Sequence, residues 1–525
     1  MNIAVLYTGG TIGSAGSPLA PLSHDAFRDA FQGLITPILK QQYLEIKVAF
    51  PPITFPESTT GTLDSTNLQP SDWCIMAQTI LDTYGGYDGW VVLHGTDSMD
   101  FTGPALSFLL ASFNTHGFPA AVLSKPVVIT GSQVPLFYQA SPGARLVLNY
   151  NTDAFQNVCG AIAAAQSGVP EVCVYFASNL FRGNRVVKTN ASEFQAFSSP
   201  NFPALGQYGI ELVINFEEVL PLPATREVSL ENEKVRTEVK KQLAYIESNI
   251  NSFPVMQFNA FPAYYPVGSD PGNSVIASLI TACVGTGIKG LILESYGEGN
   301  FPSGDPDNPS AGAIYQALLA ANNEGVILVD CTQVLSGVVN DSAYAAGAWL
   351  PGVGALNPAD MTPMAALAKL IALATVAGYQ GWTPDLVATL MQTNLMGEML
   401  SVNRLDSRSN STLAPGQSIS TLDGSVALLD DPVLGPQLKV TGSGLILWQP
   451  KLKAGVMPGR LVMQSDGDLV FYDQSNVSLW ASGTAQHGRP AASALVLAGS
   501  YAQTSTTLYI YNYASQEVIA TLYSQ

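Results

Sequence analysis

Two short clusters of hydroxyl, glycine and acidic residues follow predicted strands in the first hundred residues. The first, Thr8–Gly13, reads TGGTIG and comes directly after the apolar run IAVLY at 3–7. Glycines let the backbone turn sharply and let a ligand approach closely, so Thr11 is a candidate hydroxyl nucleophile on a strand-to-helix turn. The alternative is a phosphate-binding turn, but Gly9 and Gly10 are adjacent and the spacing G-x-G-x-x-G is not met.

The second cluster, HGTDSM at 94–99, also begins at the end of a predicted strand. Thr96 and Asp97 place a hydroxyl beside a carboxylate there. Asp97 could instead cap the following helix, since aspartate is a good N-cap residue. Lys188, in the run RGNRVVK, is a third candidate, although a lone lysine is ordinarily a solvated surface residue.

The composition narrows the classes of function. The 525 residues carry 22 Lys and Arg against 40 Asp and Glu, a net charge of −18. Such an acidic chain repels phosphate backbones and anionic lipids, so we expect no nucleic acid or membrane partner. The four dispersed histidines lack metal-ligand spacing, so no metal is expected. Five cysteines without a C-x-x-C pair indicate buried reduced thiols rather than a disulfide framework.

Targeting signals are not evident in the sequence. The N-terminus MNIAVLYTGGTIG has no basic segment and no small-residue cleavage site. No run of about 18 uncharged apolar residues predicts a membrane span. We therefore expect a cytoplasmic protein, with export by a route other than the general secretory one left open.

Short β-branched runs alternate with helix-length apolar patterns through most of the chain, which indicates parallel α/β sheets. Ligands bind beyond the carboxyl ends of the strands in such sheets. We predict an N-terminal α/β domain over 1–215, a charged connecting segment over 216–255 and a second α/β domain over 256–400. The clearest strand runs are IAVLY (3–7), WVVLHG (90–95), PVVITG (126–131), EVCVYF (171–176), KGLILES (289–295) and GVILVDC (325–331).

The composition changes after residue 400. Residues 401–415 are polar and turn-rich, which predicts a linker. Residues 416–525 contain short apolar runs at turn-separated intervals with almost no helical pattern, which predicts an all-β domain.

Taken together, the motifs of the first 400 residues resemble the bacterial-type L-asparaginase family, closest to its cytosolic type I branch. The resemblance implies a two-lobed α/β fold with parallel sheets and helices on both faces. It also implies hydrolysis of L-asparagine to L-aspartate and ammonia without a cofactor, and we expect a homodimer or homotetramer. The matching motifs are TGGTIG (8–13), LDSTNLQPSDW (63–73), HGTDSM (94–99), KPVVITGSQVPL (125–136), LFRGNRVVKTN (180–190), SYGEGN (295–300) and CTQVLSGVVNDSAYAAG (331–347).

The resemblance assigns the catalytic roles. Thr11 would attack the side-chain amide carbon, giving an acyl-enzyme and ammonia, and Thr96, Asp97 and Lys188 would form a second hydroxyl–base–acid group. This agrees with the chemistry, because a threonine hydroxyl is almost never ionised and needs a partner to take its proton. Backbone N–H groups near the glycine turn would stabilise the oxyanion.

The resemblance also assigns substrate binding. Ser65 and Thr66 would hold the α-carboxylate and α-amine of the substrate, helped by Asp97, whose carboxylate suits an ammonium group. Whether asparagine or glutamine is preferred stays open at this stage.

The chain departs from the family in the loop after the glycine turn. Many members carry a tyrosine there, but residues 8–42 contain none, and Leu19 stands in its place. Tyr344, in DSAYA at 341–345, is the best substitute hydroxyl. The alternative is that Tyr344 only packs in the second lobe.

The last 110 residues resemble bulb-type mannose-binding lectins, which implies a β-prism. QSDGDLVFY at 464–472 follows the pattern Q-x-D-x-N-x-V-x-Y with Asp468 in place of asparagine. Alternation along a strand would present Gln464, Asp466, Asp468 and Tyr472 on one face, where they suit sugar hydroxyls and mannose-type glycans are the expected ligands. The alternative is a scaffold or protein-binding module.

Two functions therefore remain from the sequence. The first is an L-asparaginase fused to a lectin-like β-prism domain. The second is a carbohydrate-directed binding protein whose asparaginase-like body is impaired because the loop tyrosine is missing.

Overall fold

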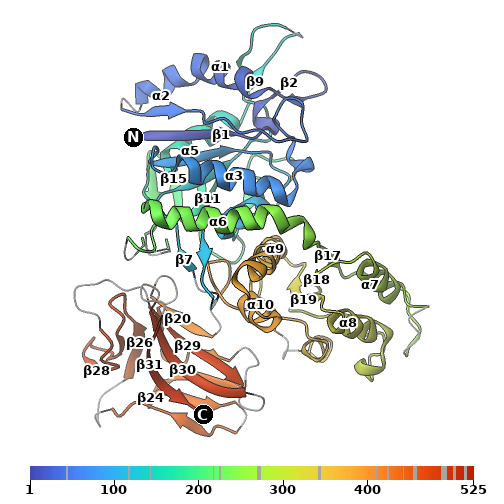
Figure 1. The fold of residues 1–525 in the computed structure, drawn as a ribbon, viewed down its shortest axis with the longest axis vertical. Helices are drawn as coiled ribbons and strands as arrows, with labels where there is room; N and C mark the ends of the chain where they lie inside the picture. Colours follow the sequence, from blue (N-terminus) through green and yellow to red (C-terminus); the bar gives the residue numbers. More distant parts are fainter. Residues whose placement is uncertain are drawn as a thin grey trace.

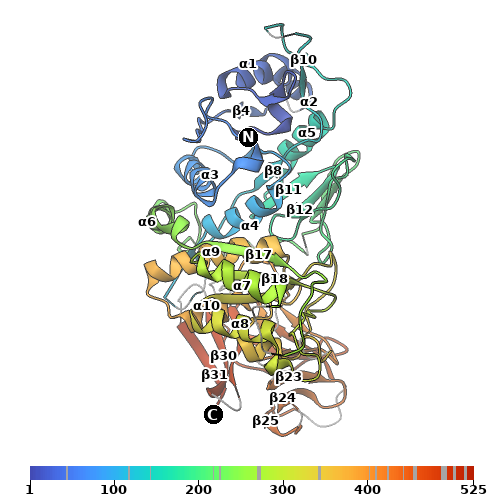
Figure 2. The same ribbon diagram turned by 90° about the vertical axis from the view of Figure 1, so that its right-hand side faces the viewer.

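The chain is organised in three parts, seen in Figures 1 and 2: an N-terminal α/β lobe, a smaller second α/β lobe and an all-β region. None of the helices in the described part of the chain has both the length and the apolar character that a membrane crossing requires. The computed structural model describes residues 1–42, 45–115, 117, 119–141, 143–216, 218–220, 222–223, 226–268, 273–340, 344–400, 403–407, 411–421, 425–441, 443–452, 458–485, 493–500, 504–512 and 517–525.

The N-terminal lobe is built on a mixed sheet with the strand order β16-β15-β12-β11-β8-β5-β1-β4 in the described residues. Strands β4, β1, β5, β8 and β11 run parallel to one another. Strands β12, β15 and β16 extend the sheet with antiparallel pairing. Their bounds are β1 (Asn2–Tyr7), β4 (Lys47–Ala49), β5 (Gly89–Leu93), β8 (Val127–Thr130), β11 (Val172–Phe176), β12 (Asn179–Arg182), β15 (Gly206–Tyr208) and β16 (Leu212–Ile214).

Both faces of this sheet are covered by helices. In β1, Ala4 and Leu6 pack into one core with α3 and α4, while Ile3, Val5 and Tyr7 pack into another with α1, α2 and α5. Because neither face meets water, the central strands are continuous apolar runs rather than alternating ones. The helices are α1 (His24–Leu34), α2 (Thr36–Gln42), α3 (Pro70–Thr83), α4 (Met99–Leu109) and α5 (Ala154–Ala164).

The second lobe has a parallel sheet in the order β17-β18-β19. Helices α7 and α8 share a core with one face of it. Helix α9 packs on its strands and also on α4, and thereby joins the two lobes. Helix α6, which lies in the predicted connecting segment, packs against α3 and α9. The elements are β17 (Val255–Asn259), β18 (Gly290–Ser295), β19 (Ile327–Thr332), α6 (Glu233–Asn249), α7 (Val275–Gly285), α8 (Ala313–Asn323), α9 (Pro363–Gln380) and α10 (Pro384–Met391).

The all-β region consists of antiparallel sheets that enclose one hydrophobic core. The first contains β22 (Ser418–Ser420), β23 (Val426–Asp431), β24 (Gly435–Val440) and β25 (Ile446–Trp448). The second contains β21 (Thr412–Leu413), β26 (Pro458–Met463), β27 (Leu469–Asp473) and β28 (Ser478–Ala481). The third contains β20 (Arg404–Asp406), β29 (Ser493–Ser500), β30 (Thr504–Asn512) and β31 (Glu517–Ser524).

The stretch predicted as a linker, 401–415, contributes strands to these sheets. β20 pairs with β29, and β21 pairs with β26. Leu405 and Leu413 lie in the shared core. Residues 401, 402 and 408–410 lie outside the described residues.

Asp430, on β23, has a buried carboxyl group. Its side chain is 0% exposed, and neither carboxyl oxygen has a hydrogen-bond partner among the described residues. Burial, helped by the neighbouring charge of Asp431, raises the pKa of Asp430 to about 7. The folded β region therefore holds this proton more tightly than the unfolded chain does.

We predict that Asp430→Asn stabilises the β region at alkaline pH. Stability should fall in the wild type as pH rises from about 4 to about 7, because only the unfolded chain releases the proton there, and the variant should lack this fall. The expected gain at pH 8 is about 1–3 kcal/mol, measured by urea unfolding at pH 5 and pH 8. Asp431→Asn is the control, because the Asp431 carboxylate accepts hydrogen bonds from the N–H groups of Val433 and Leu434 and its loss should not stabilise. A variant less stable than wild type at pH 8 would contradict the prediction.

Candidate active site

The strand order of the N-terminal sheet reverses at β1. The chain goes from β1 to β4 on one side and then crosses to β5 on the other. Ligands in open α/β sheets bind at such a reversal, beyond the carboxyl ends of the strands. Thr11 follows β1 and Thr96 follows β5, so both predicted hydroxyl residues stand at this position.

The glycine turn after β1 packs closely against the turn after β5. Gly10 has a φ of +76°, and a Cβ on it would lie 2.4 Å from Cα of Gly95. The N–H of Gly10 also donates to the carbonyl of Leu63 at 3.0 Å. Thr11 then begins a short 3-10 helix with its side chain half-buried. A glycine at position 10 is what allows the turn that leads to Thr11 to pack against the turn that leads to Thr96.

Lys188 meets Thr96 and Asp97 directly. Its Nζ donates to Thr96 Oγ1 at 2.9 Å and forms an ion pair with Asp97 Oδ1 at 2.7 Å. The Lys188 side chain is only 19% exposed, so it is not a solvated surface lysine. Ser98 rather than Asp97 occupies the N-cap of α4. The three residues thus form a chain of hydroxyl, ammonium and carboxylate groups that is open to solvent at Asp97.

His94 stabilises the turn after β5. It is fully buried, and burial lowers its pKa to about 4, so the ring is neutral at physiological pH. Nδ1 lies 2.6 Å from the Gly95 carbonyl, and Nε2 lies 3.0 Å from the Thr102 hydroxyl. Nδ1–H therefore donates to Gly95 and Nε2 accepts from Thr102, which leaves no ring nitrogen for chemistry. His94 holds the main chain that leads to Thr96.

Gln133 contacts the other side of Thr96. The Thr96 hydroxyl donates to Gln133 Oε1 at 3.3 Å, while Gln133 Nε2 donates to the carbonyl of Glu193 at 3.3 Å. The main-chain N–H groups of Gln133 and Val134 donate to the buried carboxylate of Asp153 at 2.9 and 3.0 Å. Burial raises the pKa of Asp153 against the effect of these hydrogen bonds. The turn after β8 is thereby fixed so that an amide oxygen faces the Thr96 hydroxyl.

Ser65 and Thr66 lie differently with respect to this cluster. Ser65 is buried, its Oγ accepts the N–H of Asp97 at 3.3 Å, and its carbonyl accepts the Ser98 hydroxyl at 2.7 Å. Thr66 is exposed, and its N–H and hydroxyl both donate to Asp64 Oδ1. The structure therefore brings Ser65 to Asp97, whereas the hydroxyl hydrogen of Thr66 is engaged by Asp64.

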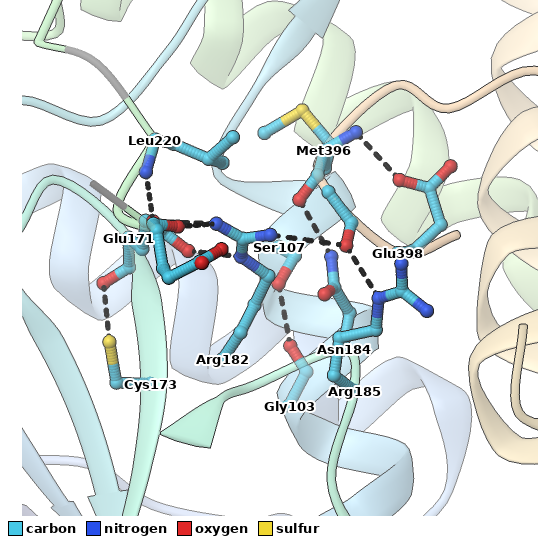
Figure 3. Close-up of polar contacts among 12 residues, drawn as sticks. Gly103, Ser107, Glu171, Cys173, Arg182, Asn184, Arg185, Leu220, Met396 and Glu398 are labelled. Atoms are coloured by element: carbon cyan, nitrogen blue, oxygen red, sulfur yellow. Dashed lines mark hydrogen bonds and ion pairs between the residues drawn. The ribbon is translucent and has the colours of Figure 1, made fainter. Parts of the chain in front are cut away.

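The segment that leads to Lys188 is anchored on the second lobe, as Figure 3 shows. Asn184 Nδ2 donates to the carbonyl of Met396 at 2.9 Å, and Arg185 Nε donates to the carbonyl of Gly397 at 2.8 Å. Both acceptors are main-chain groups. The position of the strand β13 (Val187–Lys188) thus depends on the path of the backbone near residue 397.

Both arginines of this segment also pair with buried carboxylates. Arg182 pairs with Glu171 at 2.6 Å and Arg185 with Asp360 at 2.7 Å, with none of the four side chains more than 4% exposed. Arg182 Nη2 donates to the carbonyl of Glu218 at 2.6 Å as well. Buried ion pairs are tolerated when further hydrogen bonds satisfy their remaining groups. The two ion pairs therefore fix the positions of Arg182 and Arg185.

Comparison with known proteins shows the family to which the chain belongs. The family model described as "Asparaginase, N-terminal" matches residues 2–220, and that described as "Glutaminase/Asparaginase C-terminal domain" matches residues 273–391. The chain is 32% identical over 404 residues to "L-asparaginase 1" of Escherichia coli (strain K12), covering 76% of this chain and 98% of that protein. The chain belongs to the asparaginase family.

A solved structure and a relative with a different name are also similar to this chain. The solved structure of L-asparaginase I from Vibrio cholerae superposes with a TM-score of 0.55 at 29% identity, covering 76% of this chain and 99% of that one. The asparaginase-like α/β fold predicted from the sequence is thereby confirmed. The chain is also 32% identical over 421 residues to the "60 kDa lysophospholipase" of Mus musculus. It spans only 62% of the length of that relative.

The loop that carries a tyrosine in many asparaginases is a small hairpin in this chain. It comprises β2 (Ser14–Ala15) and β3 (Ala20–Pro21), and Leu19 lies in the intervening turn with 55% exposure. Tyr344 is 56% exposed, and its carbonyl accepts the N–H of Gly347. Among the described residues, no hydrogen bond joins its hydroxyl to Thr11 or Lys188; residues 341–343 lie outside them.

The predicted carbohydrate residues do not alternate along one strand, and that expectation is wrong. β26 ends at Met463 and β27 begins at Leu469, so Gln464, Asp466 and Asp468 lie in the hairpin turn between them. Gln464 Nε2 donates to the Tyr472 hydroxyl at 2.5 Å, which brings these two together.

The Asp468 carboxylate accepts hydrogen bonds from other residues of the β region. Its Oδ1 accepts the Ser482 hydroxyl at 2.7 Å and the N–H of Thr484 at 3.1 Å. Asp466 Oδ1 accepts the N–H of Asp468 at 3.0 Å. The Asp466 carboxylate thus stabilises the turn, whose sequence Ser-Asp-Gly-Asp is itself a turn signal. The Asp468 carboxylate joins the turn to residues 482 and 484.

Several residues around the site were not predicted from the sequence. Gln133 and Asp153 lie in or after the motif TGSQVPL, but their types alone do not point to Thr96. Arg182 and Arg185 carried a usable signal, because two arginines within four residues are conspicuous in a chain with only 12% charged residues.

Tyr344 stays a prediction, and Tyr344→Phe tests it. If its hydroxyl relays the nucleophile's proton once substrate is bound, the variant should lose at least about tenfold in turnover, since a positioned proton relay contributes about 10²–10⁴-fold. Thermal stability should hardly change, because the ring is exposed. The measurement is steady-state ammonia release with asparagine. A variant that turns over at the wild-type rate would assign the relay to Lys188 or to water.

Proposed function

We propose that the chain is an L-asparagine amidohydrolase that releases L-aspartate and ammonia. The observation that carries the proposal is the contact of Lys188 with Thr96 and Asp97 beside the glycine turn that presents Thr11. A hydroxyl nucleophile, a second hydroxyl joined to an amine, and a carboxylate open to solvent are the groups that hydrolysis of a zwitterionic amide requires.

The reaction would proceed through an ester of Thr11. The Thr11 oxygen attacks the side-chain amide carbon while its proton passes toward the Thr96–Lys188 pair. The carbon–nitrogen bond of the tetrahedral intermediate then breaks, the nitrogen takes a proton, and ammonia leaves. Water next attacks the ester, releasing aspartate and restoring the Thr11 hydroxyl. Backbone N–H groups of the two turns would stabilise the oxyanion, each worth about 2.7–4 kcal/mol.

Substrate binding would itself prepare the base. In the structure the Lys188 ammonium is paired with Asp97. The α-ammonium of asparagine, bound at the same carboxylate, would share that counter-charge with Lys188. The amine would then be free to accept a proton from Thr96, whose own hydrogen faces Gln133 in the structure.

The first experiment is ammonia release from asparagine and glutamine by the full chain and three variants. Thr11→Val keeps the shape but removes the attacking oxygen, so no more than a few per cent of the activity should remain. Thr96→Val and Lys188→Met should each be severely damaging, and their losses should not add, because residues that act as a unit are non-additive. Folded wild-type protein that releases no ammonia from either amide would refute the proposal, as would a fully active Thr11→Val variant.

For the β region we propose an attachment role, with mannose-type glycans as the first ligand class to test. Of the four predicted sugar-binding residues, Gln464 and Tyr472 contact each other through their side chains. Binding is expected to be weak, with Kd about 1 mM, and should be lost in Gln464→Ala without loss of amidase activity. Titration calorimetry with mannose measures it. Unchanged binding in Gln464→Ala, or none in wild type, would leave the scaffold role in its place.

A further inference from the structure

Asp100 is a buried carboxylate that reaches the residue carrying the candidate catalytic amine. It lies in the first turn of α4, and its side chain is 5% exposed. Oδ2 accepts the main-chain N–H of Lys188 at 3.0 Å. Oδ1 has no hydrogen-bond partner among the described residues. Burial of a carboxylate is costly, and burial raises the pKa of Asp100 despite the bond to Lys188.

Lys188 therefore makes three hydrogen bonds, through two of its atoms, to one short segment, residues 96–100. Its Nζ contacts Thr96 Oγ1 and Asp97 Oδ1, and its main-chain N contacts Asp100 Oδ2. The strand that carries Lys188 is only two residues long, β13, and pairs with β14 (Phe197–Ser198). The side-chain contacts place the amine, and the Asp100 contact fixes the main chain from which the amine extends.

A carboxylate in the first turn of a helix is favoured by the helix dipole whatever its other role. Asp72 is a first-turn carboxylate of this chain that stabilises only its own helix. It lies in the first turn of α3, is fully buried, accepts the N–H of Gln69 within its own helix turn at 2.8 Å, and also leaves Oδ1 unpartnered. Asp100 differs because its acceptor serves a residue 88 positions away in the sequence. Asp72 is thus a matched control.

We propose that Asp100 is a positioning residue that presents Lys188 to Thr96 and Asp97. The bond to the Lys188 N–H holds the main chain at the distance from α4 at which the amine meets both partners. For turnover, the inference rests on the proposed amide hydrolysis. For the placement of the amine, it rests on the contacts alone.

The kinetic test compares Asp100→Ala, which removes the acceptor, with Asp100→Asn, which keeps an oxygen at the same reach. In Asp100→Ala, kcat for asparagine should fall at least about tenfold with little change in KM, because misplacing a catalytic group by about 1 Å can cost about 10²-fold. Asp100→Asn should recover most of that loss. Asp72→Ala should lower the melting temperature but leave kcat unchanged. Asp100→Ser, too short to reach Lys188, replaces the alanine variant if that one does not fold.

A second measurement does not depend on activity. Brief labelling with dilute acetic anhydride, read by mass spectrometry, compares the reactivity of Lys188 with that of Lys241, whose side chain is 58% exposed. Lys188 should react several times faster in Asp100→Ala than in wild type or Asp100→Asn, because its amine leaves its two partners. Lys241 should not change.

The two measurements separate the possible failures. If wild type releases no ammonia while Lys188 labelling responds as expected, the proposed function fails and the positioning role stands. If Asp100→Ala keeps wild-type kcat, or if Lys188 labelling does not differ from wild type, the positioning role is overturned.

Discussion

The ammonium group of Lys188 lies between a hydroxyl and a carboxylate that come almost a hundred residues earlier in the chain, and much of the N-terminal lobe is arranged around that contact. Thr96 and Asp97 are placed by the end of β5, by His94 beneath it and by Ser65 beside it. Lys188 is placed by a two-residue strand that has little stability of its own. It is held from the side of α4 by Asp100 and from the side of the second lobe by Arg185 and its neighbours.

Among the described residues, the second lobe contributes to the site through main-chain carbonyls, and none of its side chains contacts the Lys188 ammonium. Asn184 and Arg185 bind main-chain carbonyls of residues 396 and 397, and Arg182 approaches the same turn. A Cβ on Gly397 would lie 2.7 Å from Arg182 Nη1, so that turn accepts the guanidinium only because the residue is glycine. The turn at residues 396–397 is followed by Glu398, which forms a fully buried ion pair with Lys369 of α9.

Local sequence patterns predicted much of the fold. They could not predict which residues far apart in the sequence contact each other. The continuous apolar runs gave β1, β5, β8 and β11 because both faces of the sheet are covered, and the glycine turn identified Thr11. Gln133 and Asp100 could not be found, since their significance lies in contacts with residues 37 and 88 positions away. In the β region, strands of two or three residues such as β20 and β21 are too short to show a period. The stretch containing them therefore looked like a linker.

The order in which the β region uses its strands has a consequence for its synthesis. The consecutive strands β20, β21 and β22 each belong to a different sheet, and each sheet is completed only by hairpins that come later in the chain. On the ribosome, β20 emerges more than eighty residues before β29, to which it pairs. The asparaginase-like lobes can fold as soon as they emerge, whereas β20, which carries Leu405, stays unpaired until β29 is made. A nascent chain stalled just before β29 would expose the unpaired edge of β20 next to the already folded asparaginase-like lobes.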